Sequence, residues 1–153
     1  MPFATHILVP TDFSDASRLS TRAAALLAER LGLKVTILHV HDPNGLRPPA
    51  QMAFSREDVD AIEAEVLATV QAELEAIRTR DFANVADVDT ALIEDESPSR
   101  AICDRAEAIG ADLIVISTHG RTGLKHLLIG SVAERVLRHS MVPVLSLRSS
   151  AKD

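Results

Sequence analysis

The chain of 153 residues contains no tryptophan and no tyrosine, and it has only four phenylalanines. Because 46% of its residues are nevertheless hydrophobic, the core must be built from alanine, valine, leucine and isoleucine. The single cysteine, Cys103, excludes an internal disulfide, which fits a reducing cytoplasm. We predict that Cys103 is a small, buried or half-buried helix residue and not a nucleophile.

Long apolar runs are also lacking, since none approaches the roughly 18–20 residues that span a bilayer. The first residues show neither the basic start nor the long apolar region of a signal peptide. Basic residues (16) are fewer than acidic ones (22), and the net charge of −6 argues against nucleic acid or an anionic membrane as the main partner. Without repeats or low-complexity tracts, residues 1–153 are expected to form one cytoplasmic domain.

Short apolar runs alternate with helical patterns along the whole chain. The predicted strands are 6–9, 35–40, 85–93, 113–116 and 142–147. Four helices are predicted: one that ends at Leu31, one over 56–80, one over 98–109 and one that begins at Ser131. The first helix has an apolar face of Leu19, Ala23, Leu26, Leu27 and Leu31. Residues 41–54, rich in proline, are expected to form an irregular, mobile connection.

Three of these segments carry more specific expectations. The strand at 113–116 is the most completely apolar and is therefore predicted to be the most central. The alternating strand at 85–93 is predicted either to have a more exposed face or to lie at an edge. Ser131 and Glu134 have the spacing of a capping box for the last helix.

The alternation of strands and helices predicts an α/β fold with a five-stranded, mainly parallel, doubly wound (Rossmann-like) sheet in strand order 3-2-1-4-5. Such sheets bind ligands at the carboxyl ends of the strands, where the strand order reverses. The loops after the first and fourth strands, residues 10–14 and 117–131, are expected to flank that crevice.

The loop at 117–131 has the composition of an anion-binding segment. It contains Gly120, Gly123 and Gly130, and no acidic residue occurs between Leu113 and Ala133. Backbone N–H groups in a glycine-rich loop and the start of a helix both attract phosphate. The alternative is a long surface turn whose glycines serve only its conformation. The basic side chains in the loop at 117–131, which also favour an anion, are His119, Arg121, Lys125 and His126.

These motifs resemble the universal stress protein family over nearly the whole chain. Its nucleotide-binding members carry Gly-x-x-Gly, nine residues and Gly-Ser or Gly-Thr. Gly120 and Gly130-Ser131 match the second part, and Ser117 replaces the first glycine. The similarity includes the opening Ile-Leu-Val-Pro-Thr-Asp-Phe-Ser, the strand Ile-Leu-His-Val, the run Thr-His-Gly-Arg-Thr-Gly, the segment Gly-Ser-Val-Ala-Glu-Arg-Val and the closing Pro-Val-Leu.

The resemblance implies an ATP-binding site in which Pro10, Thr11 and Asp12 line the adenosine pocket. It also implies that Val40 presents backbone groups to adenine and that Gly120, Gly130 and Ser131 hold the phosphates. A divalent cation, Mg²⁺ or Mn²⁺, would bridge the phosphates instead of occupying a protein cage. Further contacts are expected from neighbouring loop residues: Ser117, Thr118, His119, Arg121, Gly123 and Val132.

Several residues have a competing structural interpretation. Asp12 could cap the first helix, a role for which Ser14 and Asp15 compete. The acidic residues 94–96 would repel a polyphosphate unless they face solvent or help to hold a metal. Polar loop positions explain the histidines of the chain more simply than catalysis or a metal site with Asp42; these histidines are His39, His41, His119 and His126.

The last strand would leave an open apolar edge, which in the family pairs with its equivalent across a twofold axis. The candidate interface residues are Val142, Val144, Leu145 and Leu147. We therefore predict a homodimeric stress-response regulator that binds ATP or a related adenine nucleotide, turns it over slowly if at all, and acts on an unidentified target protein. The alternatives are a nucleotide-independent interaction module of the same fold and a slow ATPase or phosphotransferase.

Overall fold

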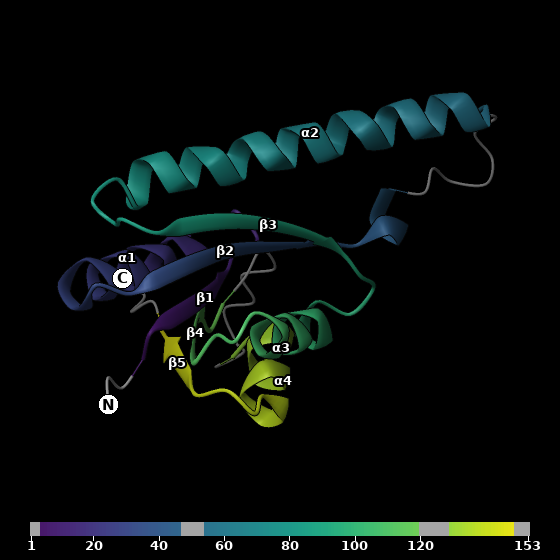
Figure 1. Cartoon of the computed structure of the whole chain (residues 1–153). Coiled ribbons are helices and arrows are strands. Elements are labelled where there is room, and N and C mark those ends of the chain that lie inside the picture. Colours follow the sequence, from purple (N-terminus) through teal and green to yellow (C-terminus); the bar gives the residue numbers. More distant parts are fainter. Residues whose placement is uncertain (1–3, 47–53, 120–128, 149–153) are drawn as a thin grey trace, which may run out of the picture.

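The computed structural model describes residues 4–46, 54–119 and 129–148, in which strands and helices alternate (Figure 1). All strand pairs are parallel and their order is β3-β2-β1-β4-β5, which confirms the predicted α/β fold. The elements are β1 His6–Pro10, α1 Ser17–Leu31, β2 Lys34–His41, the 3₁₀ turn η1 Pro43–Leu46, α2 Arg56–Asp81, β3 Val88–Glu94, α3 Pro98–Ala108, β4 Leu113–Ser117, α4 Ser131–His139 and β5 Val144–Leu147.

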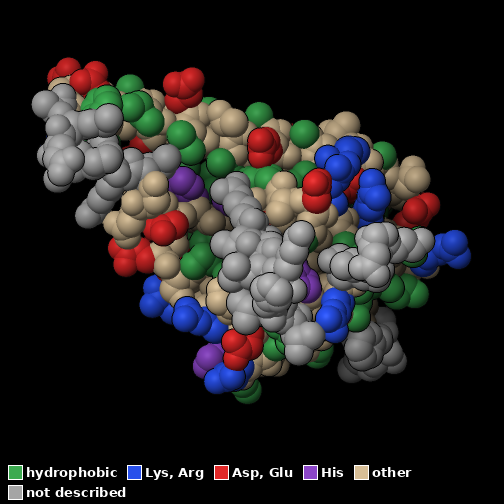
Figure 2. All heavy atoms as spheres, turned by 180° about the vertical axis from the view of Figure 1, so that it is seen from behind, with side chains coloured by type: hydrophobic (Ala, Val, Ile, Leu, Met, Phe, Trp, Pro, Cys, Tyr) green, Lys and Arg blue, Asp and Glu red, His purple; other side chains and the backbone are tan. Residues whose placement is uncertain are grey.

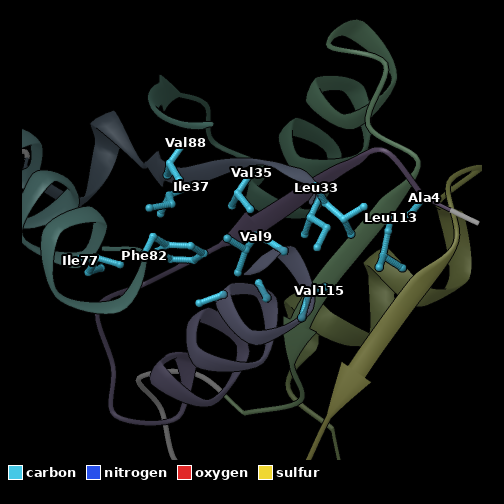
Figure 3. Packing of buried hydrophobic residues seen from close by; sticks show 14 of the residues in the cluster. Ala4, Val9, Leu33, Val35, Ile37, Ile77, Phe82, Val88, Leu113 and Val115 are labelled. Atoms are coloured by element: carbon cyan, nitrogen blue, oxygen red, sulfur yellow. The ribbon is translucent and has the colours of Figure 1, made fainter. Parts of the chain in front are cut away.

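Two apolar clusters, one on each face of the sheet, form the core. Ile7 and Val9 of β1 belong to the cluster that α1 and α2 cover, whereas Leu8 belongs to the one that α3 and α4 cover. This division follows from the alternation of side chains along a strand. In the first cluster, Phe82 at the end of α2 reaches toward Val9 (Figure 3). Most of the buried side chains are aliphatic, as the composition predicts.

The central strand is β1, and the prediction that residues 113–116 are the most central is wrong. Every residue of β1 is buried, and β1 pairs with both β2 and β4. β4 is also nearly fully buried, but it lies between β1 and the edge strand β5. Both strands are covered on their two faces by helices, so apolar composition alone does not rank them. The edge position of β3 is confirmed.

The first helix buries a face that only partly coincides with the predicted one. Three of its leucines are exposed, Leu19 by 38%, Leu26 by 55% and Leu31 by 63%, whereas Ala23 and Leu27 are partly buried against the first cluster. Small residues with the same helical period face the sheet instead, because they allow the helix to approach the strands closely. The buried positions are Ser17, Ser20, Thr21, Ala24, Ala25 and Ala28.

Helix α2 spans 26 residues, as predicted to within one residue, and it starts with a capping box between Ser55 and Asp58. Only Leu74 and Ile77 of this helix are buried, and its amino-terminal end projects beyond the sheet (Figure 1). Acidic side chains lie on the surface of that projecting end (Figure 2). The predicted irregular connection at 41–54 contains the last residue of β2 and the turn η1, and residues 47–53 lie outside the described part.

The starts of two strands differ from the prediction by two or three residues, and the other strand boundaries lie within one residue of it. The amide of Val85 donates to the carbonyl of Phe82 in a turn (3.0 Å), so that β3 begins only at Val88. Likewise β5 begins at Val144, after Pro143. No helix in the described ranges is long and apolar enough to cross a membrane.

Candidate functional site

A cavity of about 280 Å³ opens at the carboxyl ends of the central strands β1 and β4. At this point the chain leaves β1 and β4 toward opposite faces of the sheet, since α1 and α4 belong to different layers. Every predicted site residue that the structure describes lies in its lining: Pro10, Thr11, Asp12, Val40, Ser117, Thr118, His119, Gly130, Ser131 and Val132. The loops after the first and fourth strands therefore do meet around one crevice. Gly120, Arg121 and Gly123 lie outside the described residues.

The loop after β1 is held by hydroxyl and carboxylate groups. The Thr11 amide donates to the Leu38 carbonyl (2.8 Å) and so extends the pairing of β1 with β2 by one residue. The Thr11 hydroxyl accepts a hydrogen bond from the Phe13 amide (3.1 Å) and lies 3.0 Å from the Ser17 hydroxyl. Because Thr11 is only 6% exposed, these bonds form inside the protein and fix the start of the loop.

The carboxylate of Asp12 binds the next turn of the same loop. Its Oδ1 accepts from the Ser14 amide (3.0 Å) and from the Ser14 hydroxyl (2.5 Å). The N-cap of α1 is Ala16, without a side-chain cap, so Asp12 does not cap the helix. Asp12 instead shapes the turn that lines the cavity, and its contact with a ligand stays a prediction.

Phe13 has a left-handed backbone conformation with φ of 64°. For a bulky residue this conformation costs about 1–3 kcal/mol and persists only where the surroundings enforce it. The ring of Phe13 lies 4.5 Å from that of His39, at 30° between planes, and the Nδ1 atom of His39 lies 2.8 Å from the Thr11 carbonyl oxygen. His39 thus holds both Thr11 and Phe13, and the strained loop is fixed from the β2 side.

The two ends of the glycine-rich segment are joined to each other and to β5. The Gly130 amide donates to the Thr118 carbonyl (2.5 Å), and the Thr118 amide donates to the Leu147 carbonyl (2.8 Å). The hydroxyl of Ser117, which stands where the family motif has glycine, donates to the His119 carbonyl (2.9 Å). Ser117 therefore uses its side chain to shape the loop and needs no glycine conformation.

Helix α4 begins at the cavity. Gly130 is its N-cap, with φ of −69° and ψ of 154°, and no side-chain cap is present, so the predicted capping box of Ser131 and Glu134 is wrong. The helix starts one residue earlier than that motif requires, and the Glu134 amide donates to the Gly130 carbonyl (2.9 Å). Ser131 is left in the first turn, where N–H groups and the helix dipole favour an anion.

The acidic residues 94–96 do not line the cavity. Asp95 accepts from the Ser97 amide (2.7 Å) and forms an ion pair with Arg100 (2.9 Å). The Oε1 atom of Glu96 accepts from the side-chain amide of Asn44 (2.5 Å). These bonds direct Asp95 and Glu96 to partners outside the lining, so the repulsion of a polyphosphate that the sequence suggested is reduced.

The sequence did not identify seven of the lining residues. Pro98 and Ile102 come from α3, the helix that connects β3 to β4. Because β3 and β4 lie on opposite sides of the β2–β1 pair, this connection passes over the crevice. No sequence motif marks Pro98 and Ile102 as lining residues. The other lining residues that the sequence did not identify look like ordinary core residues. The further lining residues are Ser17, Leu38, His39, Ile116 and Ala133.

The ionisable lining of the cavity consists, in the described ranges, of Asp12, His39 and His119, and it includes no lysine or arginine. No group of three metal-ligating side chains occurs among the described residues. Cys103 is buried on the α3 side of the core, and burial, followed by the charges of Asp104 and Glu107, raises the pKa of its thiol. The described cavity thus offers hydrogen bonds, a helix start and an apolar surface.

The chain is similar to known proteins in sequence and in fold. Residues 4–148 match the model of the universal stress protein family. The chain is 31% identical over 150 residues to universal stress protein MJ0531 of Methanocaldococcus jannaschii, covering 96% of this chain and 84% of that protein.

Solved structures have the same fold. The structure of protein MJ0577 superposes with a TM-score of 0.83 at 26% identity, covering 97% of this chain and 98% of that one. A universal stress protein in complex with cAMP superposes with a TM-score of 0.69 at 24% identity, covering 96% and 98%. The match to the family model extends over almost all of the chain, and we conclude that the chain belongs to the universal stress protein family.

Proposed function

We propose that this protein binds ATP, or a related adenine nucleotide, in the cavity at the ends of β1 and β4, and that it acts as a regulator in stress adaptation. The observation that carries the proposal is the meeting of two polar loop ends, a helix start and an apolar surface around one cavity. An adenine ring needs apolar contact, whereas phosphates need N–H and hydroxyl donors. The occurrence of a cAMP complex in a protein with this fold supports the same ligand class.

The proposed arrangement follows the positions of the lining residues. Asp12 binds the nucleoside, and the backbone of Val40 contacts the adenine edge. The start of α4, with Gly130 and Ser131, binds the phosphates. Mg²⁺ or Mn²⁺ would fit this lining as an ion held mainly by the phosphates, because hydroxyl, carboxylate and backbone oxygen atoms surround the cavity. Its chemistry there is the neutralisation of phosphate charge.

We further propose that the protein is a homodimer that pairs through β5 in the cytoplasm. β5 is an edge strand, and Leu145 on it is 37% exposed. Pairing with a second β5 across a twofold axis would satisfy both edges at once. We expect Leu145→Lys to give a monomer in size-exclusion chromatography with light scattering. Ile62→Lys, at a 43% exposed position of α2, is the matched control and retains the dimer.

Binding of nucleotide is tested first on the purified protein. The protein is denatured, the released compounds are identified by mass spectrometry, and ATP–Mg²⁺ is then titrated by calorimetry. We expect micromolar binding that Gly130→Ala/Ser131→Ala weakens at least about tenfold. Alanine adopts the backbone angles of Gly130 without strain, so the variant folds. Gly45→Ala is the control, since a Cβ at Gly45 meets open space.

The outcomes separate three functions. No bound nucleotide and no heat from a folded dimer would contradict ATP binding and favour a nucleotide-independent interaction module. Metal-dependent phosphate release that Asp12→Asn abolishes would favour the slow ATPase. Binding without sustained release supports the regulator proposed here.

A further inference from the structure

A second cavity, of about 300 Å³, lies between the first turns of α1 and the carboxyl-terminal half of α2. Thr11 and Ser17 line both this cavity and the first one, so the pair of hydroxyls 3.0 Å apart stands between them. Phe13 faces the second cavity, whereas the preceding Asp12 faces the first. Phe13 therefore contributes an aromatic surface to the second cavity while it also packs against the core.

One donor in the wall of this cavity lacks an acceptor. The Nε atom of Arg18 is buried and has no hydrogen-bond partner among the described residues. Among the described residues Arg18 forms one ion pair, a long one of 3.7 Å from Nη1 to Asp15, whose side chain is 99% exposed. The Arg18 side chain as a whole is 43% exposed, so a ligand in the cavity can reach its guanidinium group, which has no close carboxylate partner among the described residues.

The second arginine of the cavity, Arg80, is already occupied. Its Nε and Nη2 atoms donate to the two carboxylate oxygens of Asp81, each at 2.7 Å. Asp81 also accepts from the Thr21 hydroxyl (2.9 Å), so this pair is held rigidly in place. The cation that can receive a ligand carboxylate is therefore Arg18, through a charge-assisted hydrogen bond.

The remaining walls exclude a plain anion. Since Asp81 neutralises Arg80, the acids Asp15 and Glu73 face Arg18 alone, and a ligand with only negative charge meets repulsion from them. A ligand with both charges is complementary to the lining. Phe13 and Ile77 add an apolar surface for an aliphatic side chain.

We propose that this cavity is a second binding site, for a small zwitterion of the α-amino acid class. The ligand carboxylate accepts from Arg18, its ammonium group lies toward Glu73, and its aliphatic side chain contacts Phe13 and Ile77. The proposal is independent of nucleotide binding in the first cavity.

L-leucine is the probe, titrated into the purified protein by calorimetry and by two-dimensional NMR. Two analogues test the paired charges: 4-methylpentanoate lacks the ammonium group, and 3-methylbutylamine lacks the carboxylate. We expect saturable binding of L-leucine and binding of each analogue that is at least about tenfold weaker.

Two variants locate the site. We expect Arg18→Gln and Glu73→Gln each to weaken L-leucine binding about tenfold, a loss of about 1.4 kcal/mol. Arg22→Gln, an exposed position on the same helix outside the lining, is the matched control and retains binding. Unchanged thermal unfolding shows that the variants fold. The proposal is overturned by absence of L-leucine binding at millimolar concentration, by equal binding of 4-methylpentanoate, or by variants that bind like wild type.

Discussion

Replacing Thr11 with valine tests how the loop after β1 supports the candidate site. Valine has nearly the same shape but lacks the hydroxyl that accepts from the Phe13 amide (3.1 Å) and lies 3.0 Å from the Ser17 hydroxyl. Two buried hydrogen bonds at about 0.5–1.5 kcal/mol each set the expected loss of unfolding free energy at about 1–3 kcal/mol. Without its acceptor, the left-handed Phe13 is also less well held.

The loop should then relax away from the cavity, and we expect the affinity for ATP–Mg²⁺ to fall about tenfold, equivalent to about 1.4 kcal/mol. Urea unfolding and calorimetric titration measure the two effects separately. Thr36→Val is the matched control, because the Thr36 hydroxyl is also buried but bonds His6 Nε2 (2.8 Å) at the other end of the sheet. That variant should lose stability and keep its ATP affinity. A Thr11→Val protein with wild-type stability and affinity would refute the role assigned to this loop.

Three further predictions concern stability. Leu74→Ala should lower the unfolding free energy by about 3 kcal/mol, because Leu74 is 1% exposed, whereas Ile62→Ala at 43% exposure should cost less than about 0.5 kcal/mol in urea unfolding. Burial and then the charge of Lys34 lower the pKa of His6 below 6.5, so the unfolded state binds a proton first as pH falls. Stability should therefore decrease with decreasing pH below about 6.5, and His6→Gln should flatten that slope in pH-dependent denaturation. Burial raises the pKa of Asp112, but hydrogen bonds to its carboxylate outweigh burial and hold the pKa below 3.8. The ionised carboxylate therefore stabilises the folded protein at neutral pH, and wild type loses this stabilisation only as pH falls through the folded-state pKa. Asp112→Asn should remove the same stabilisation at neutral pH.

Each of these has a result that would contradict it. Equal losses for the two apolar substitutions would mean that α2 does not pack as described. A His6→Gln variant whose stability depends on pH like wild type would show that His6 is not the titrating group. For Asp112, the donors are the amides of Thr5 and His6 and the Thr5 hydroxyl, and an unchanged stability of Asp112→Asn at neutral pH would mean that these bonds contribute nothing.

The local pattern of the chain predicted the elements but not which helix face is buried. In α1, leucines and small residues repeat with the same helical period, so periodicity supports either face. The structure buries Ala24 and Ala28 and exposes Leu26, because the short distance between helix and sheet selects small side chains. Similarly, α4 begins at Ser131 with Gly130 as its N-cap and without a capping box, because the hydrogen bond from the Gly130 amide to the Thr118 carbonyl fixes this start.

The sequence by itself determined the strand and helix pattern, the aliphatic core and the two polar loops after β1 and β4, because periodicity, glycine spacing and charge are local properties. It could not identify Pro98 and Ile102 as lining residues, nor the second cavity at Arg18. Those depend on which elements the strand order β3-β2-β1-β4-β5 brings together, and on how closely α1 and α2 pack against the sheet. Contacts between residues far apart in the chain arise only from tertiary packing, so they leave no signal in a local pattern.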